Sequence, residues 1–271
     1  MNFKSFNRAV YALLILVYLA LFVSCEYHKE LDYYEKYDSP QLIVHGYICP
    51  QYGVQVIVKK ATSPSDVSGD DRILNANVFL LTTNTEFIQL RQLNDYFFEC
   101  DSLSYIEENK SYYLRIVSDE FGESFSGKEK ILHAPQIDSV RIVTEPRKVA
   151  IVYFNNNYSN GESFIIESRN YKDGRVERSD ALEKFNPFSI ERHVQHGFNA
   201  IERSLYGEFD SVQIVLHVIS PVLTKFLVSQ QNYDTSKEDP FYPQPYPVFT
   251  NISGGYGIFA SHSFDTVVAK K

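Results

Sequence analysis

The stretch Gln41–Val58, QLIVHGYICPQYGVQVIV, sets the class of fold expected for this chain. Its first half, Gln41–Ile48, is a short apolar run, and Val54–Val58 is a second one rich in β-branched residues. Pro50 and Gly53 stand between the two runs. A pair of such runs across a turn of this kind is typical of a β-hairpin. We therefore predict a sheet protein whose first strand begins at residue 41.

The residues that follow the hairpin repeat this pattern as far as residue 134. Short apolar segments alternate with turns of Asn, Asp, Ser and Gly. The expected strands are Ala76–Leu81, Glu86–Leu90, Tyr96–Glu99, Ser111–Val117 and Glu123–Lys128. The chain has 20 Tyr and 20 Phe but no Trp and a single Met, a composition that favours sheet. Segments this short predict an immunoglobulin-like β-sandwich over residues 41–134.

A second β-rich unit is expected over residues 135–271. His133-Ala134-Pro135 marks the joint, because proline extends the residue before it and cannot continue a ladder. The expected strands are Ile137–Val143, Val149–Phe154, Phe164–Ser168, Ser211–Val218 and Ile258–Val268. One short helix is expected near 221–231, with Ser220 as its N-cap and Pro221 in its first turn. Gly254-Gly255 supplies a tight turn before the final strand. The polar stretch Lys172–Gly207 has no clear pattern.

The N-terminus has the features of an export signal. Two basic residues precede an unbroken apolar run, Ala9–Val23, and Ser24-Cys25 follows it. A cysteine directly after such a run resembles a bacterial lipobox, in which the thiol is converted to a diacylglyceryl thioether and the cysteine becomes the new N-terminus. We expect residues 1–24 to be removed, Cys25 to carry the lipid, and residues 25–40 to form a polar tether. The alternative is a plain N-terminal membrane anchor, but the run is shorter than the roughly 20 residues that span a bilayer.

Charge excludes one class of partner. The full chain has a formal charge of −8, and removal of residues 1–24 leaves 24 basic and 34 acidic side chains, or −10. An acidic chain without a Lys/Arg cluster has no electrostatic means of neutralising nucleic-acid phosphates. We therefore expect no nucleic-acid partner, and attachment to the membrane through acyl chains alone.

Cys49 and Cys100 are the thiols that remain after lipidation of Cys25. In an exported protein an even pair can form a disulfide, and by the chain-entropy model a loop of this length would stabilise the fold by roughly 4 kcal/mol. The alternative is two separate buried thiols, and the sequence leaves both open.

The sequence offers no clear catalytic or metal site. His193 and His196 have a spacing compatible with two metal ligands, but no HExxH motif accompanies them, and two surface histidines are the favoured interpretation. No G-x-S-x-G nucleophile elbow is present. Paired acids such as Asp70-Asp71 and Glu107-Glu108 lie in polar, loop-like stretches, where they usually face solvent. We predict that the protein is not an enzyme and uses no cofactor or metal.

The best candidate for a contact surface is the loop Asp239–Pro247, DPFYPQPYP. Its prolines restrict the backbone, and its aromatic rings supply area that can stack on a sugar, a peptide or a partner barrel. The candidate contact residues are Phe241, Tyr242, Tyr246 and Phe249. The alternative, which we favour from the sequence, is that these rings fold back and cover the open end of the second unit.

The layout resembles the DUF4249 family of Bacteroidetes outer-membrane lipoproteins. The landmarks are Leu42–Ile48, Ala134–Val140, Ser220-Pro221, Asp239-Pro240-Phe241 and Asn251–Phe259, which reads NISGGYGIF. Such proteins are commonly encoded beside TonB-dependent receptors. The resemblance therefore implies an accessory lipoprotein of the outer membrane, on either face of that membrane. It implies help with nutrient capture or uptake and supplies no catalytic residues. A structural or adhesive protein of the cell envelope is the alternative.

Overall fold

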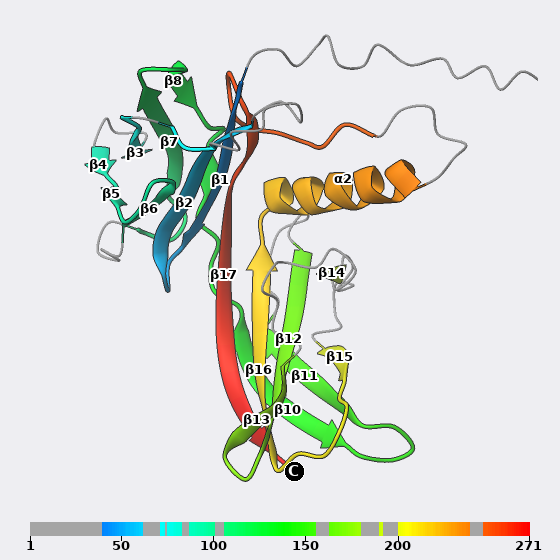
Figure 1. Ribbon diagram of the computed structural model, residues 1–271. Coiled ribbons are helices and arrows are strands. Elements are labelled where there is room, and N and C mark those ends of the chain that lie inside the picture. Colours follow the sequence, from blue (N-terminus) through cyan, green and yellow to red (C-terminus); the bar gives the residue numbers. More distant parts are fainter. Residues whose placement is uncertain are drawn as a thin grey trace, which may run out of the picture. The chain divides into compact units, whose positions relative to one another are not determined.

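In the computed structural model the chain is mainly β-structure, as predicted (Figure 1). The residues that it describes are 40–61, 71–73, 75–82, 87–100, 106–155, 163–179, 190–191, 200–238 and 246–271. Residues 1–39 lie outside this part of the chain, and with them the predicted signal, Cys25 and nearly all of the tether. All of the described segments belong to one packed unit, Ser39–Lys271.

Three sheets are present within the described residues. The largest has nine strands, in the order β13 (Arg175–Ser179), β12 (Ser163–Lys172), β16 (Ser211–Ile219), β17 (Tyr256–Lys270), β1 (Gln41–Cys49), β2 (Gly53–Ala61), β6 (Phe97–Cys100) and β5 (Arg91–Gln92), with β14 (Ile190–Glu191) beside β12. The five-stranded sheet has the order β4 (Phe87–Gln89), β3 (Asn77–Thr82), β7 (Ser111–Ser118) and β8 (Gly122–Phe125), with β9 (Glu129–Lys130) beside β7. The three-stranded sheet consists of β10 (Gln136–Val143), β11 (Val149–Asn155) and β15 (Ala200–Ser204).

The predicted hairpin forms and supplies one wall of the first core. β1 and β2 pair antiparallel over nine residues, and alternate residues of β1 are buried, as a half-covered strand requires. Val44 and Val56 of this wall belong to the same apolar cluster as Leu80 and Leu114 of the five-stranded sheet. Two sheets therefore pack face to face, which confirms the predicted β-sandwich.

The second core lies between the three-stranded sheet and the other end of the nine-stranded sheet. Val152 and Phe154 of β11 pack in one cluster with Phe164 of β12 and Ile214 of β16. The stretch Lys172–Gly207, which shows no clear pattern in the sequence, contains β13 and β15. β13 turns back on β12 through the two-residue connection Asp173-Gly174.

β17 joins the two cores, so the predicted division at residues 134/135 needs a correction. The first part of β17 pairs parallel with β1, and the rest, from His262 onward, pairs antiparallel with β16. The C-terminal strand is therefore shared by both sandwiches. Pairing of segments more than 200 residues apart leaves no local pattern, which is why the sequence alone did not reveal it.

Glycine makes the contact between β17 and β1 possible. Gly257 has a φ of 110°, and a Cβ atom there would lie 1.9 Å from the carbonyl oxygen of Val44. A Cβ atom on Gly255 would lie 2.8 Å from the carbonyl oxygen of Leu42. The motif NISGGYGIF therefore does more than form the expected turn, because it brings one backbone directly against another.

The predicted helix is α2 (Pro221–Glu238). Its cap is as expected: the Ser220 hydroxyl accepts a hydrogen bond from the Leu223 N–H at 3.2 Å. Leu223, Phe226 and Leu227 pack against the nine-stranded sheet. The helix extends past the expected end near residue 231, and its last turns hold Ser236, which is buried.

Candidate functional site

A continuous line of rings crosses the face of the nine-stranded sheet that α2 also covers. We call it the aromatic row, and its members are Tyr52, Phe264, His217, His262 and Tyr47. Ring centroids are 5.0 Å apart for Tyr52–Phe264 and 5.4 Å for Phe264–His217, then 5.8 Å for His217–His262 and 6.4 Å for His262–Tyr47. These separations fall in the range of favourable ring contacts. Tyr52 at one end is 63% exposed, whereas both histidines are buried.

Strand register explains why the row and the helix share one face. Phe264 lies opposite His217, and His262 lies opposite Ile219. Residues directly opposite in a ladder point to the same side of the sheet. Ile219 packs in one cluster with Leu223 of α2, so the row continues from the helix-covered part of this face.

A buried acid accompanies the row. Glu167 of β12 is 7% exposed, and one carboxylate oxygen lies 3.1 Å from Nε2 of His217. The two are diagonal neighbours on one face, because His217 lies opposite Ile165 and Glu167 lies opposite Val215. At this distance each group lowers the cost of burying the other.

Burial keeps two members of the row, His262 and Tyr47, uncharged near neutral pH. Desolvation, together with the neighbouring His217, lowers the pKa of His262 to about 3. Desolvation also raises the pKa of the Tyr47 phenol. A neutral imidazole and a neutral phenol can take part in hydrogen bonds, and neither brings a charge into the interior.

The opposite side of β17 is polar as well, but its groups bind other parts of the backbone. Ser261 donates its hydroxyl to the Lys130 carbonyl at 2.7 Å, and Ser263 donates to the Leu132 carbonyl at 2.7 Å. The buried Glu129 carboxylate accepts the backbone N–H of Ser261 at 3.0 Å. Burial raises the pKa of Glu129, although hydrogen bonds from Ser220 and Ser261 oppose the shift.

The sequence Ser261-His262-Ser263 therefore does not form a nucleophile–base pair. Successive side chains of a strand point to opposite faces, so both serines lie on the face away from His262. Both hydroxyls already donate to carbonyls. A serine nucleophile needs its base within hydrogen-bond reach. The described geometry suits non-covalent contact better than acyl transfer.

The predicted contact residues divide into described and undescribed ones. Phe241 and Tyr242 lie outside the described residues. Tyr246 is 49% exposed, and its N–H donates to the Ser236 hydroxyl at 3.0 Å. The Phe249 N–H donates to Ser229 at 2.8 Å, and its ring packs against the cluster below α2. Phe249 thus follows the alternative in which the rings fold back, and Tyr246 faces solvent.

The disulfide considered from the sequence is not formed. Both Cys49 and Cys100 are free thiols. Cys49 of β1 lies opposite Gly53, and Cys100 of β6 lies opposite Val54, so β2 separates them. Two strand spacings amount to roughly 9–10 Å, more than the roughly 7 Å limit for a bridge. Burial raises the pKa of the Cys49 thiol to about 11.

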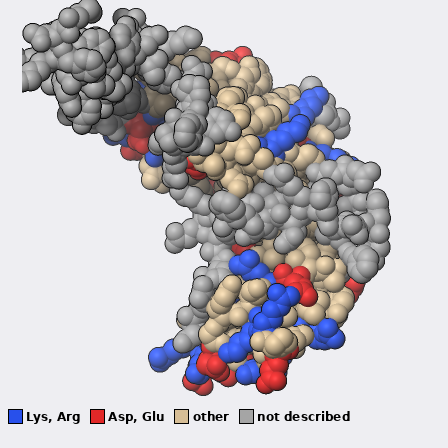
Figure 2. All heavy atoms as spheres, turned by 90° about the vertical axis from the view of Figure 1, so that its right-hand side faces the viewer, with Lys and Arg blue, Asp and Glu red and all other residues tan. Residues whose placement is uncertain are grey.

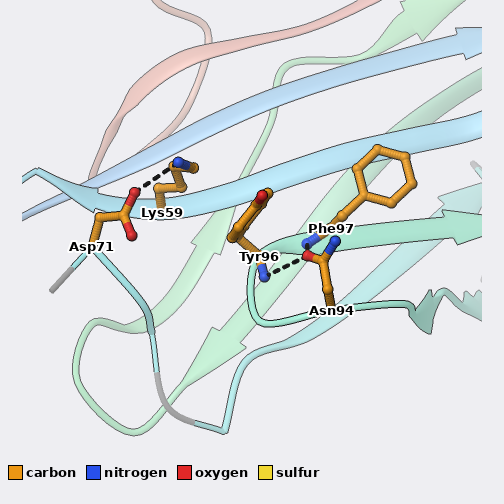
Figure 3. A network of polar contacts seen from close by, with 5 residues as sticks. All are labelled: Lys59, Asp71, Asn94, Tyr96 and Phe97. Atoms are coloured by element: carbon orange, nitrogen blue, oxygen red, sulfur yellow. Dashed lines mark hydrogen bonds and ion pairs between the residues drawn. The ribbon is translucent and has the colours of Figure 1, made fainter.

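The acids singled out in the sequence have basic neighbours where they are described. The Asp71 carboxylate lies 2.7 Å from the Lys59 ammonium, which also sits 4.4 Å above the centre of the Tyr96 ring (Figure 3). In the adjoining turn the Asn94 side-chain oxygen accepts the N–H groups of Tyr96 and Phe97 at 3.1 and 2.9 Å. This network fixes the turn before β6 against β2.

Glu107 pairs with Lys110, and Glu108 pairs with His133. Among the described residues no group of three or more His, Cys, Asp or Glu side chains has a metal-binding arrangement. His193 and His196 lie outside this part of the chain. Charges of both signs are interspersed at the lower end of the face shown in Figure 2.

Sequence reasoning missed the aromatic row, although a signal was present. Glu167, His217 and His262 each interrupt a strongly apolar strand, in FIIESRNY, VQIVLHVI and IFASHSF. A polar residue at a buried strand position needs a partner. Nothing in the sequence, however, places these three strands side by side.

Comparisons with known proteins identify the family of this chain but do not indicate its function. The described part of the chain contains no helix long and apolar enough to cross a membrane. No curated protein sequence matches the chain. Among solved structures, it is similar to the chicken interferon gamma receptor alpha chain, at 10% identity over 68% of this chain and 90% of that one, with a TM-score of 0.25. A two-domain fibronectin type III segment of chicken tenascin shares 9% identity over 86% of this chain and 100% of that one, with a TM-score of 0.22.

TM-scores this low do not establish a shared fold, so the sandwich assignment rests on the sheets and cores of this chain itself. The family model matches a large share of the chain. The model of a domain of unknown function, DUF4249, matches residues 27–267. The match covers nearly the whole chain, and the chain belongs to the DUF4249 family.

Proposed function

We propose that this protein is a lipid-anchored binding protein of the outer membrane that serves a TonB-dependent receptor in nutrient capture or uptake. The observation that carries the proposal is Cys25, which directly follows the apolar run Ala9–Val23. Acylation there would hold the folded unit at a membrane surface without a spanning segment. The receptor enters through the family resemblance, in which such lipoproteins accompany TonB-dependent receptors.

The described geometry supports binding in preference to catalysis. The buried serines of β17 are engaged with other parts of the protein: Ser261 with the Lys130 carbonyl and the Glu129 carboxylate, and Ser263 with the Leu132 carbonyl. The exposed rings of Tyr52 and Tyr246, in contrast, offer flat apolar area to a partner. Exposed aromatic residues are enriched where proteins bind ligands or other proteins. We assign ligand or receptor contact to these two positions.

The anchor is tested by mass spectrometry of the exported protein. We expect loss of residues 1–24 and the added mass of acyl chains on Cys25. Cys25→Ala should abolish the modification and release the protein from the membrane, whereas Cys100→Ala should leave both unchanged. An unmodified Cys25 in the natural protein, or a leader still in place, would overturn the anchor.

The partner is tested by affinity capture from detergent-solubilised outer membranes. We expect an outer-membrane receptor to be recovered with the natural chain, and less of it with Tyr52→Ala and Tyr246→Ala. Growth on limiting nutrients should fall when the gene is deleted. Absence of a receptor together with unchanged growth would contradict the proposal, and a defect confined to adhesion would favour the structural alternative.

A further inference from the structure

The first and last described strands lie side by side and have the geometry of a mechanical clamp. β1 begins 16 residues after Cys25, so the tether leads straight into it. β1 and β17 run parallel over six registered pairs, from Ile43–Tyr256 to Ile48–Ser261. β1 has β2 on its other side, so the tether enters an interior strand of the sheet.

We propose that the β1–β17 pair is a clamp that carries mechanical load between the tether and the second sandwich. This inference rests on the proposed attachment at Cys25, because a load needs a fixed end. The opposing load would come from any partner that binds the second sandwich. Force would then enter at the start of β1 and leave through the C-terminal half of β17.

Direction determines how the pair resists such a force. In a parallel pair, tension between the start of one strand and the end of the other slides the strands along each other. Because the bonds of a parallel ladder are evenly spaced along both strands, they share that load and break nearly together. Tension between the starts of both strands opens the same ladder one bond at a time. Only the first direction corresponds to a load between tether and second sandwich.

The other edge of β17 is also held over the length of the clamp. The Asn251 side chain donates to the Phe259 carbonyl at 2.8 Å and accepts the Phe259 N–H at 2.8 Å, so it imitates a neighbouring strand. The Ser220 N–H donates to the Ser261 carbonyl at 3.1 Å, and Glu129 accepts the Ser261 N–H. β17 cannot slide along β1 without breaking these bonds too.

Close backbone contact adds a steric lock. Gly257 allows the backbone of β17 to approach the Val44 carbonyl more closely than any side chain would permit. Sliding by one residue would place Tyr256 or Ile258 opposite Val44. Each of these residues carries a Cβ atom in place of the glycine hydrogen, so the register resists displacement in either direction.

The test is single-molecule force spectroscopy on residues 26–271, without lipid, in a Cys100→Ser background. One handle is fused to the N-terminus. The second is attached either through Lys271→Cys, which loads the ladder in sliding, or through Ser253→Cys, which lies just before β17 and loads it in opening. At equal loading rates we expect the rupture force for the sliding direction to be at least about twofold higher, since its bonds break together. Equal forces, or a lower force in the sliding direction, would overturn the clamp.

A side-chain variant sharpens the test. Asn251→Ala should lower the sliding force, while Asn77→Ala, on the exposed side of β3, should leave it unchanged. If Asn251→Ala does not fold, the comparison of two pulling directions still decides, because it uses the natural contacts. The outcome is also separable from the proposed function. Equal forces remove the clamp and leave the anchor, whereas an unmodified Cys25 removes the anchor and leaves the measured difference in force.

Discussion

The two faces of β17 differ at the point where this strand passes from β1 to β16. One face carries Ser261 and Ser263, whose hydroxyls bind the segment that links the two sandwiches. Glu129 belongs to this segment and accepts from the Ser261 hydroxyl. The other carries His262 and Phe264, which belong to the aromatic row. Both faces are buried and polar. The first is a structural joint, and the second leads to a ring exposed to solvent, so buried polarity alone does not identify a functional site.

The largest effect is expected when the pairing of β17 with β1 is disrupted, because the groups on both faces of β17 depend on that pairing. We expect Gly257→Ala to destabilise the fold by more than about 3 kcal/mol, since its Cβ atom would collide with the Val44 carbonyl. Urea unfolding measures the effect. Gly122→Ala is the matched control: φ there is also positive, at 67°, but nothing lies within 4 Å, so a loss of about 1 kcal/mol is expected. Equal losses at the two sites would contradict the account of close backbone approach.

The strands of the first sandwich could be predicted from sequence more fully than the site could. β1 follows from a short apolar run, and in β7 the buried Tyr112 and Leu114 flank the more exposed Tyr113, as expected for a strand covered on one face. The cap of α2 could also be predicted, because it too is a local pattern: Ser220 and Leu223 are three residues apart. The row, in contrast, needs β1, β16 and β17 to be neighbours. That adjacency depends on a parallel pairing between the two ends of the chain, which no local pattern encodes.

The face that carries the aromatic row should make the stability of the fold depend on pH through His262. The pKa of His262 is about 3 in the fold and near 6.5 in an unfolded chain, so the unfolded state binds the proton more readily between these values. Stability from this group is therefore present above pH 6.5 and falls as pH drops below it, by up to about 1.4 kcal/mol per pH unit. We expect His262→Gln to flatten this dependence when urea unfolding is measured from pH 7 to pH 5. A slope that His262→Gln leaves unchanged would contradict this account.

The other face should respond to pH in the opposite sense. Burial raises the pKa of Glu129 in the fold, so the protonated form is favoured there. The stability that this group contributes is present at low pH and is lost as pH rises through its folded pKa. Relative to Glu129→Gln, which keeps an acceptor for the Ser261 N–H, the natural chain should lose stability as pH increases from 4 to 7. Hydrogen bonds to the carboxylate oppose the shift, so the effect should be smaller than that of His262. A stability of the natural chain that stays constant or rises relative to Glu129→Gln over this pH range would contradict the assignment.

The smallest effect is expected at the exposed end of the row, and it separates stability from binding. Tyr52→Ala removes the ring contact with Phe264, which should cost about 1 kcal/mol or less, because such pairs contribute roughly 0.5–1.5 kcal/mol beyond area. Tyr256→Ala, at a similarly exposed position, is the matched control for loss of a surface ring. If Tyr52 is a contact residue, its replacement should weaken receptor capture far more than this small loss of stability explains, because a chain this slightly destabilised stays folded. A loss of capture shared equally by Tyr256→Ala would mean that surface rings act without regard to position, and the row would then be only a feature of the fold.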